Sequence, residues 1–182
     1  MNRRTATVIF IICTIIMAAF PATYANAAET IAVPADQVAV EVCEPVLYVE
    51  YNGTYVSLDK EGNVCGESAS KPNDLPVLTG IEFTELTYGQ KAVTETPAAL
   101  EYAIEAEQLF TRYSISVTSM NVENSMLTVK VNNLVIKMGK NYNTERKIND
   151  LADFIDQIID QSGTLSMQNE NADKYGYSFR AG

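Results

Sequence analysis

Residues 38–182 predict an α+β domain, in which two amphipathic helices cover one face of a curved, mostly antiparallel sheet. Short segments of alternating hydrophobic residues, separated by tight-turn signals, predict the strands. Two longer segments with hydrophobic residues at helical spacing predict the helices. Because each element has one apolar side, we expect the helices to cover one sheet face and solvent to wet the other.

The first strands form a predicted hairpin. Valines at positions 38, 40 and 42 alternate with other residues, and segments 46–51 and 54–58 flank Asn52-Gly53. Asn-Gly between alternating segments is the strongest short hairpin signal. Asn52-Gly53-Thr54 also fits a glycosylation sequon, but the turn explains it better. A turn at residues 59–62 and a polar surface loop at residues 66–74 follow.

The first predicted helix starts with Thr96 as N-cap and Pro97 as first helical residue, and ends near Arg112. The second begins at Asn143 or Thr144 and stops at Ser162-Gly163. We expect Phe110 of the first helix and Leu151 and Ile155 of the second to pack on the sheet.

Three strands are predicted between the helices, at residues 115–120, 126–131 and 134–138. Asn132-Asn133 joins the last two, since Asn tolerates the positive φ of a tight turn. Their predicted core face holds Leu127, Val129, Val131, Leu134, Ile136 and Met138. Their predicted solvent face holds Thr128, Lys130, Val135 and Lys137.

Residues 1–28 predict a signal peptide or a membrane anchor, and residues 29–37 a linker. A basic start at Arg3-Arg4 precedes the uncharged apolar run from Thr5 to Phe20, which is short for a bilayer span. Small residues at Ala25 and Ala27 favour cleavage after Ala27. The alternative is an uncleaved anchor, because no charge appears before Ala28. Both interpretations take the rest of the chain out of the cytoplasm.

Composition argues against several functions. The formal net charge of −10 repels nucleic acid and anionic lipid. The chain contains no His, the commonest general base and metal ligand, and no Gly-rich phosphate loop. We therefore expect no catalytic or metal site, no cofactor and no small-molecule substrate. The recurring acidic residues of the second helix fit a solvated face: Asp150, Asp153, Asp156 and Asp160.

Cys43 and Cys65 form the only cysteine pair in the exported part, where oxidation is possible. A disulfide between them would close a loop of about 22 residues and stabilise by about 3 kcal/mol in the chain-entropy model. The alternative is two separate, small, buried apolar residues.

Four segments, in order, resemble the β domain of the FtsQ/DivIB cell-division family over residues 38–182. They are Leu58-Asp59-Lys60-Glu61-Gly62-Asn63-Val64 after the hairpin; Leu75-Pro76-Val77-Leu78-Thr79-Gly80; Leu127 to Met138-Gly139 with Lys147-Ile148 and Leu151; and Gly163-Thr164-Leu165-Ser166-Met167 followed by Tyr175 to Arg180. Val42-Cys43 and Ser166 depart from the family, which usually shows Glu-Arg and Asp there. No POTRA module is evident before the β domain.

The resemblance implies a non-enzymatic scaffold at the extracytoplasmic face of the membrane at the septum, or a secreted one if residues 1–28 are cleaved. Implied partners are FtsB/DivIC and FtsL, with membrane contact through an uncleaved N-terminal segment. The alternative function is a secreted or surface-exposed module that uses this fold for an unrelated protein or cell-wall ligand.

The closing strands are the predicted partner site, with Leu165, Met167, Tyr175, Tyr177 and Phe179 as its residues. A strand that ends the chain often lies at a sheet edge, where its unpaired backbone groups template an added strand. The three aromatics alternate onto one face, and Tyr is a favoured interface anchor. The alternative is that these aromatics cover the core and the strand only completes the sheet.

Overall fold

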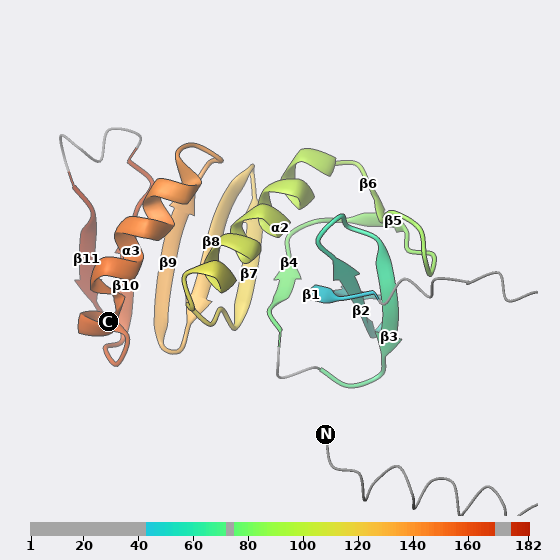
Figure 1. The fold of residues 1–182 in the computed structure, drawn as a ribbon, viewed down its shortest axis with the longest axis horizontal. Helices are drawn as coiled ribbons and strands as arrows, with labels where there is room; N and C mark the ends of the chain where they lie inside the picture. Colours follow the sequence, from blue (N-terminus) through green and yellow to red (C-terminus); the bar gives the residue numbers. More distant parts are fainter. Residues whose placement is uncertain (1–42, 72–74, 170–175) are drawn as a thin grey trace, which may run out of the picture. The chain divides into compact units, whose positions relative to one another are not determined.

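The computed structural model describes residues 43–71, 75–169 and 176–182. These residues form two helices and eleven strands (Figure 1). The predicted strand at residues 38–42 and the predicted leader and linker lie outside the described residues. The elements in chain order are β1 (Pro45–Tyr51), β2 (Thr54–Asp59), β3 (Val64–Ser68), β4 (Val77–Thr79), β5 (Phe83–Glu85), β6 (Val93–Thr94), α2 (Pro97–Arg112), β7 (Ser119–Glu123), β8 (Met126–Val131), β9 (Leu134–Gly139), α3 (Thr144–Ile158), β10 (Gly163–Ser166) and β11 (Ser178–Ala181).

Nine strands form one mixed sheet in the order β11-β10-β9-β8-β7-β4-β1-β2-β3, and β5 and β6 form a separate small ladder. Both predicted hairpins are confirmed: β1 pairs with β2 around Asn52-Gly53, and β8 pairs with β9 around Asn132-Asn133. Three neighbouring pairs are parallel, namely β1 with β4, β4 with β7, and β9 with β10. The expected α+β architecture with a mostly antiparallel sheet is therefore confirmed. The parallel strand pairs occur where the chain crosses over between strands.

Helices α2 and α3 both cover the same face of the sheet (Figure 1). Leu127, Val129 and Ile136 are buried beneath them, as predicted, together with Phe110, Leu151 and Ile155. The buried Tyr102 hydroxyl donates a 3.1 Å hydrogen bond to the Gly139 carbonyl oxygen, which ties α2 to the end of β9. Burial raises the pKa of Tyr102 to about 12. On the open face Lys130 and Lys137 are exposed, as expected.

Three predicted boundaries are wrong. Helix α3 ends at Ile158, before the predicted stop at Ser162-Gly163, because the chain tightens there and the Gln161 amide bonds the Ile158 carbonyl. The strand expected at residues 115–120 is Ser119–Glu123, because Ser114 adopts φ 59° and the Ile115 amide still bonds the Phe110 carbonyl at the end of α2. The loop expected at residues 66–74 starts too early, because Val64–Ser68 forms β3. Its polar residues are tolerated at the sheet edge, and pairing with β2 extends to Ser68 opposite Tyr55.

Gly80 shows why one of the sequence motifs needs glycine. It follows β4, has φ +85°, and a Cβ at this position would collide with the Val122 carbonyl oxygen of neighbouring β7. Backbone that approaches this closely at positive φ accepts no other residue without strain. The described ranges contain no helix that is both long enough and apolar enough to span a membrane.

Candidate partner-binding edge

The candidate site is the end of the sheet formed by β10 and β11. β10 lies parallel to β9, and β11 pairs antiparallel with β10, with Leu165 opposite Phe179 and Thr164 opposite Arg180. β11 is the terminal strand of the nine-stranded sheet. Its outer backbone edge therefore has no neighbouring strand among the described residues.

Tyr177 is the residue before β11, and its side chain is anchored to α3. Its hydroxyl donates a 2.7 Å hydrogen bond to Asp150 Oδ2, and its ring centroid lies 6.4 Å from that of Phe154. Arg146 Nε lies 3.9 Å from the same Asp150 oxygen. The half-buried Tyr177 thus packs against the core, as the alternative interpretation of these aromatics expects. The predicted solvated position of Asp150 is wrong: this residue is half-buried and anchors the tyrosine.

Phe179 remains partly accessible, with 37% of its surface exposed. Its ring lies over Gly163 of the paired strand, where an added Cβ would come within 2.8 Å of the ring carbons. Gly163, predicted as a helix stop and as the first residue of a closing strand, therefore also leaves room for this aromatic. No sequence signal identified this second role.

The remaining predicted site residues differ in position. Leu165 and Met167 are buried, with 2% and 0% of their surface exposed, so their side chains belong to the core and do not face a partner. Tyr175 lies outside the described residues. Exposed Arg180 on β11, the edge strand, and exposed Lys137 on β9, two strands further in, add positive charge to this end of the sheet in an acidic chain.

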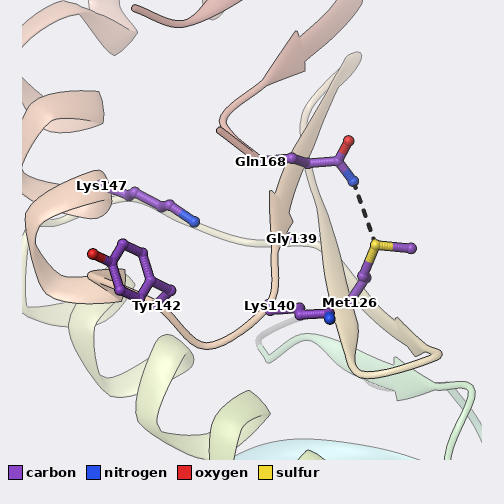
Figure 2. A pocket seen from close by; sticks show the side chains of 6 residues that line it. All are labelled: Met126, Gly139, Lys140, Tyr142, Lys147 and Gln168. Carbon is purple, nitrogen blue, oxygen red and sulfur yellow. Dashed lines mark hydrogen bonds between the residues drawn. The ribbon is translucent and has the colours of Figure 1, made fainter. Parts of the chain in front are cut away.

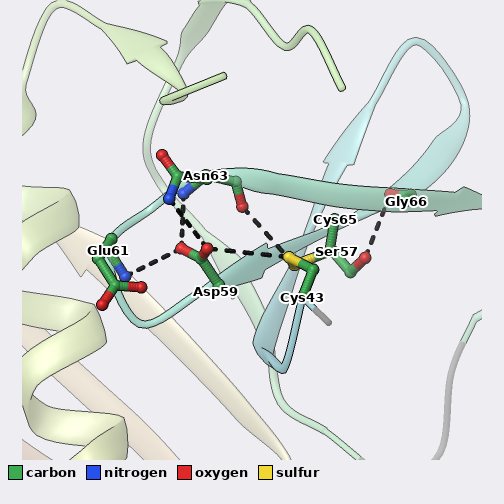
Figure 3. Close-up of a disulfide and its surroundings, with 7 residues drawn as sticks. All are labelled: Cys43, Ser57, Asp59, Glu61, Asn63, Cys65 and Gly66. Atoms are coloured by element: carbon green, nitrogen blue, oxygen red, sulfur yellow. Dashed lines mark hydrogen bonds between the residues drawn. A yellow bond between two sulfur atoms is a disulfide. The ribbon is translucent and has the colours of Figure 1, made fainter. Parts of the chain in front are cut away.

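A second feature lies at the opposite end of the sheet, where a disulfide joins Cys43 to Cys65 with their Cα atoms 5.5 Å apart (Figure 3). This separation is typical of disulfides. Asp59 organises the adjacent turn, since its Oδ1 accepts hydrogen bonds from the Glu61 and Asn63 amides at 2.9 and 2.7 Å. Its Oδ2 lies 3.8 Å from Cys43 Sγ. Within the described ranges, one group brings three potential metal ligands together: Cys43, Asp59 and Cys65. The two sulfur atoms of this group are bonded to each other.

One buried acidic residue, Glu107, takes part in neither the β11 edge nor the turn beside the disulfide. Glu107 of α2 is only 5% exposed, and burial raises its pKa to about 8. Thr111 Oγ1 donates a 3.4 Å hydrogen bond to Glu107 Oε1, while Oε2 has no hydrogen-bond partner. Helical periodicity did not single out this residue, because charged side chains are rarely buried.

Comparisons with known proteins give a family match and a solved structure of low similarity. The fold is similar to a solved structure, the major extracytoplasmic domain of the trans isomer of the bacterial cell division protein DivIB from Geobacillus stearothermophilus. The TM-score is 0.42 and the identity 13%, over 64% of this chain and 96% of that one. A search of curated proteins finds no match to the chain. The family model described as FtsQ/DivIB, C-terminal related, matches residues 44–171, and the chain therefore belongs to this family.

Proposed function

We propose that this chain is a non-enzymatic, extracytoplasmic scaffold of bacterial cell division that binds FtsB/DivIC-type and FtsL-type partners at the outer edge of β11. The observation that carries the proposal is the position of β11 as the last strand of the nine-stranded sheet. An open strand edge offers backbone donors and acceptors to which an extended partner segment can add as a further strand.

The hydrogen-bond register identifies the backbone groups that would bind. The Gly182 amide donates a 3.0 Å hydrogen bond to the Ser162 carbonyl, so this amide points inward, toward β10. Bonding direction alternates along an antiparallel strand. The amides of Phe179 and Ala181 therefore point to the outer edge, where a partner strand would accept from them.

Side chains of the last three strands at this end of the sheet support a partner of acidic character. Arg180 and Lys137 are exposed, and no acidic residue occurs in β9, β10 or β11. Complementary charge raises the association rate and disfavours wrong partners. Tyr177, fixed on α3 by Asp150, positions the start of β11 but does not itself present an open face.

Export by the N-terminal segment is part of the proposal. Cleavage after Ala27 would release the scaffold from the membrane, whereas retention of residues 1–28 would keep it anchored. Mass spectrometry of the mature protein separates the two, because a species that starts at Met1 in the membrane fraction excludes cleavage.

The test of the edge is Ala181→Pro in the full-length protein. Proline removes the outward amide of Ala181 and leaves the inward bond of Gly182 in place; edge strands accept proline. We expect capture of a purified FtsB/DivIC-type extracytoplasmic segment to weaken by about tenfold or more, the scale of one hot spot. Ala181→Val is the matched control, since it changes the side chain and keeps the amide.

Unchanged binding by Ala181→Pro, with the melting temperature also unchanged, would show that the β11 edge is not the partner site. Capture of neither FtsB/DivIC-type nor FtsL-type segments by the wild-type protein would favour the alternative, a surface module for an unrelated ligand. Deleting residues 175–182 is a coarser test, because it also removes Tyr177 from α3.

A further inference from the structure

A small cavity of about 130 Å³ lies where β9 ends and α3 begins, apart from the outer edge of β11 (Figure 2). Segments distant in sequence come together there: the start of β8, the end of β9, the first turn of α3 and the residue after Met167. Its lining residues are Met126, Gly139, Lys140, Tyr142, Lys147 and Gln168.

A good hydrogen-bond donor meets a poor acceptor on one side of the cavity. The Gln168 side-chain amide nitrogen lies 3.9 Å from Met126 Sδ. A thioether sulfur accepts hydrogen bonds only weakly. The side chain of Lys140, an exposed residue, extends toward Met126 (Figure 2). A carboxylate oxygen placed here would accept far better than the sulfur does.

The charge of the lining is positive. Lys147 is 3% exposed, and its Nζ donates a 2.8 Å hydrogen bond to the Met138 carbonyl oxygen. Lys140 adds a second ammonium, and none of the described lining residues is acidic. The full chain carries a formal net charge of −10, so this lining has the opposite sign to the molecule as a whole.

The rim of the cavity is apolar. Met126 and Tyr142 are two of the large hydrophobic residues that the described surface leaves exposed, at 39% and 47%. The Tyr142 ring forms a wall, with its hydroxyl turned away from Met126 (Figure 2). Gly139 keeps the opposite wall close, because a Cβ there would lie 3.1 Å from the Gln168 Cα. The volume suits a carboxylate with a short aliphatic stem.

We propose that this cavity binds a peptide carboxylate, with Lys140 and Gln168 as donors to its oxygens, Lys147 as a second positive charge, and Met126 and Tyr142 against its stem. The site is independent of the β11 edge, since the amides of Phe179 and Ala181 take no part in it. A partner that presents an acidic side chain or a chain terminus would gain a second point of attachment.

The test is a titration of isotope-labelled full-length protein, followed by amide NMR signals. The probes are N-acetyl-glutamate N-methylamide, its glutamine counterpart, N-acetylglycine and inorganic phosphate. We expect the glutamate probe to shift the signals of Gly139, Lys140 and Gln168 saturably, and the neutral glutamine probe to leave them unmoved. A stronger response to N-acetylglycine would assign the site to a chain terminus, and a stronger response to the glutamate probe to an acidic side chain.

Lys140→Met should weaken binding of the carboxylate by about tenfold or more, because it removes a charge-assisted hydrogen bond. Lys130→Met is the matched control: it removes the same charge from an exposed lysine of β8 outside the cavity. Equal weakening by both variants, equal shifts with the glutamine probe, or equally tight binding of phosphate would overturn the peptide-carboxylate site. These outcomes leave the edge proposal standing, because its test uses Ala181.

Discussion

The Tyr177 hydroxyl donates a 2.7 Å hydrogen bond to Asp150 Oδ2, so the segment that leads into the last strand is fastened to helix α3. The Phe154 ring supports the same tyrosine from the next turn of the helix. The free edge of β11 is therefore held by a side-chain contact in addition to its backbone ladder with β10.

Removing that hydroxyl should loosen β11 selectively. In Tyr177→Phe we expect a loss of about 1 kcal/mol in the free energy of unfolding, the usual net contribution of a hydrogen bond. Hydrogen exchange should quicken at the inward amides of β11, while β8 stays protected. Tyr88→Phe is the control, because Tyr88 is 75% exposed. Equal exchange in both variants would show that the contact does not hold the strand.

Ile155 tests the packing of α3 on the sheet. It is 6% exposed and belongs to the core cluster with Leu151 and Ile136. Ile155→Ala should lower the free energy of unfolding by about 2–5 kcal/mol, as expected for a buried cavity. Chemical denaturation measures the change, with Gln157→Ala on the exposed side of the same helix as control. An unchanged midpoint for Ile155→Ala contradicts the helix face described here.

Glu107 predicts a pH dependence of stability. Its folded pKa of about 8 lies above the ordinary value for a glutamate, so the folded state binds a proton that the unfolded state has released. From about pH 4.5 to about pH 8 this group therefore lowers stability as pH rises, by at most about 1.4 kcal/mol per pH unit.

Glu107→Gln should remove this loss, so the variant should be more stable than wild type at pH 8 and gain much less at pH 4.5. Urea denaturation at the two pH values measures the difference. Glu101→Gln, on the same helix and exposed, should behave as wild type does. If Glu107→Gln raises the free energy of unfolding equally at both pH values, the cause is a change in packing and not the titration of Glu107.

The disulfide predicts a redox dependence of stability. Replacing both Cys43 and Cys65 by Ser should lower the free energy of unfolding by about 3 kcal/mol, from the loop entropy that the bond removes. Without reductant, neither cysteine of the folded protein should react with an alkylating reagent, which mass spectrometry detects. Fully reduced protein serves as the control, because both cysteines should then react. Alkylation of both cysteines in protein isolated from the extracytoplasmic side would argue against the bond.

Sequence alone determined the elements whose signals are local. Asn52-Gly53 and Asn132-Asn133 lie at tight turns because Asn and Gly accept positive φ, and the φ values of 51°, 83° and 52° at Asn52, Gly53 and Asn132 agree. Pro97 starts α2, where the missing amide costs no helical bond. Alternation in β8 and β9 correctly separated the buried Val129 and Ile136 from the exposed Lys130 and Lys137, since side chains alternate strictly along a strand.

Tertiary structure decided what depends on neighbours distant along the chain. β4 is only three residues long, and it becomes a strand because parallel partners, β1 and β7, lie on both sides. Asp150 has the spacing of a solvated helical residue, and only the return of Tyr177 makes it an anchor. Likewise, no local pattern brings Met126 and Gln168 into one cavity with Lys147; the packing of β8, β10 and α3 around the end of β9 does so. Periodicity predicts which face of an element is buried, whereas the chain's path determines what that face meets.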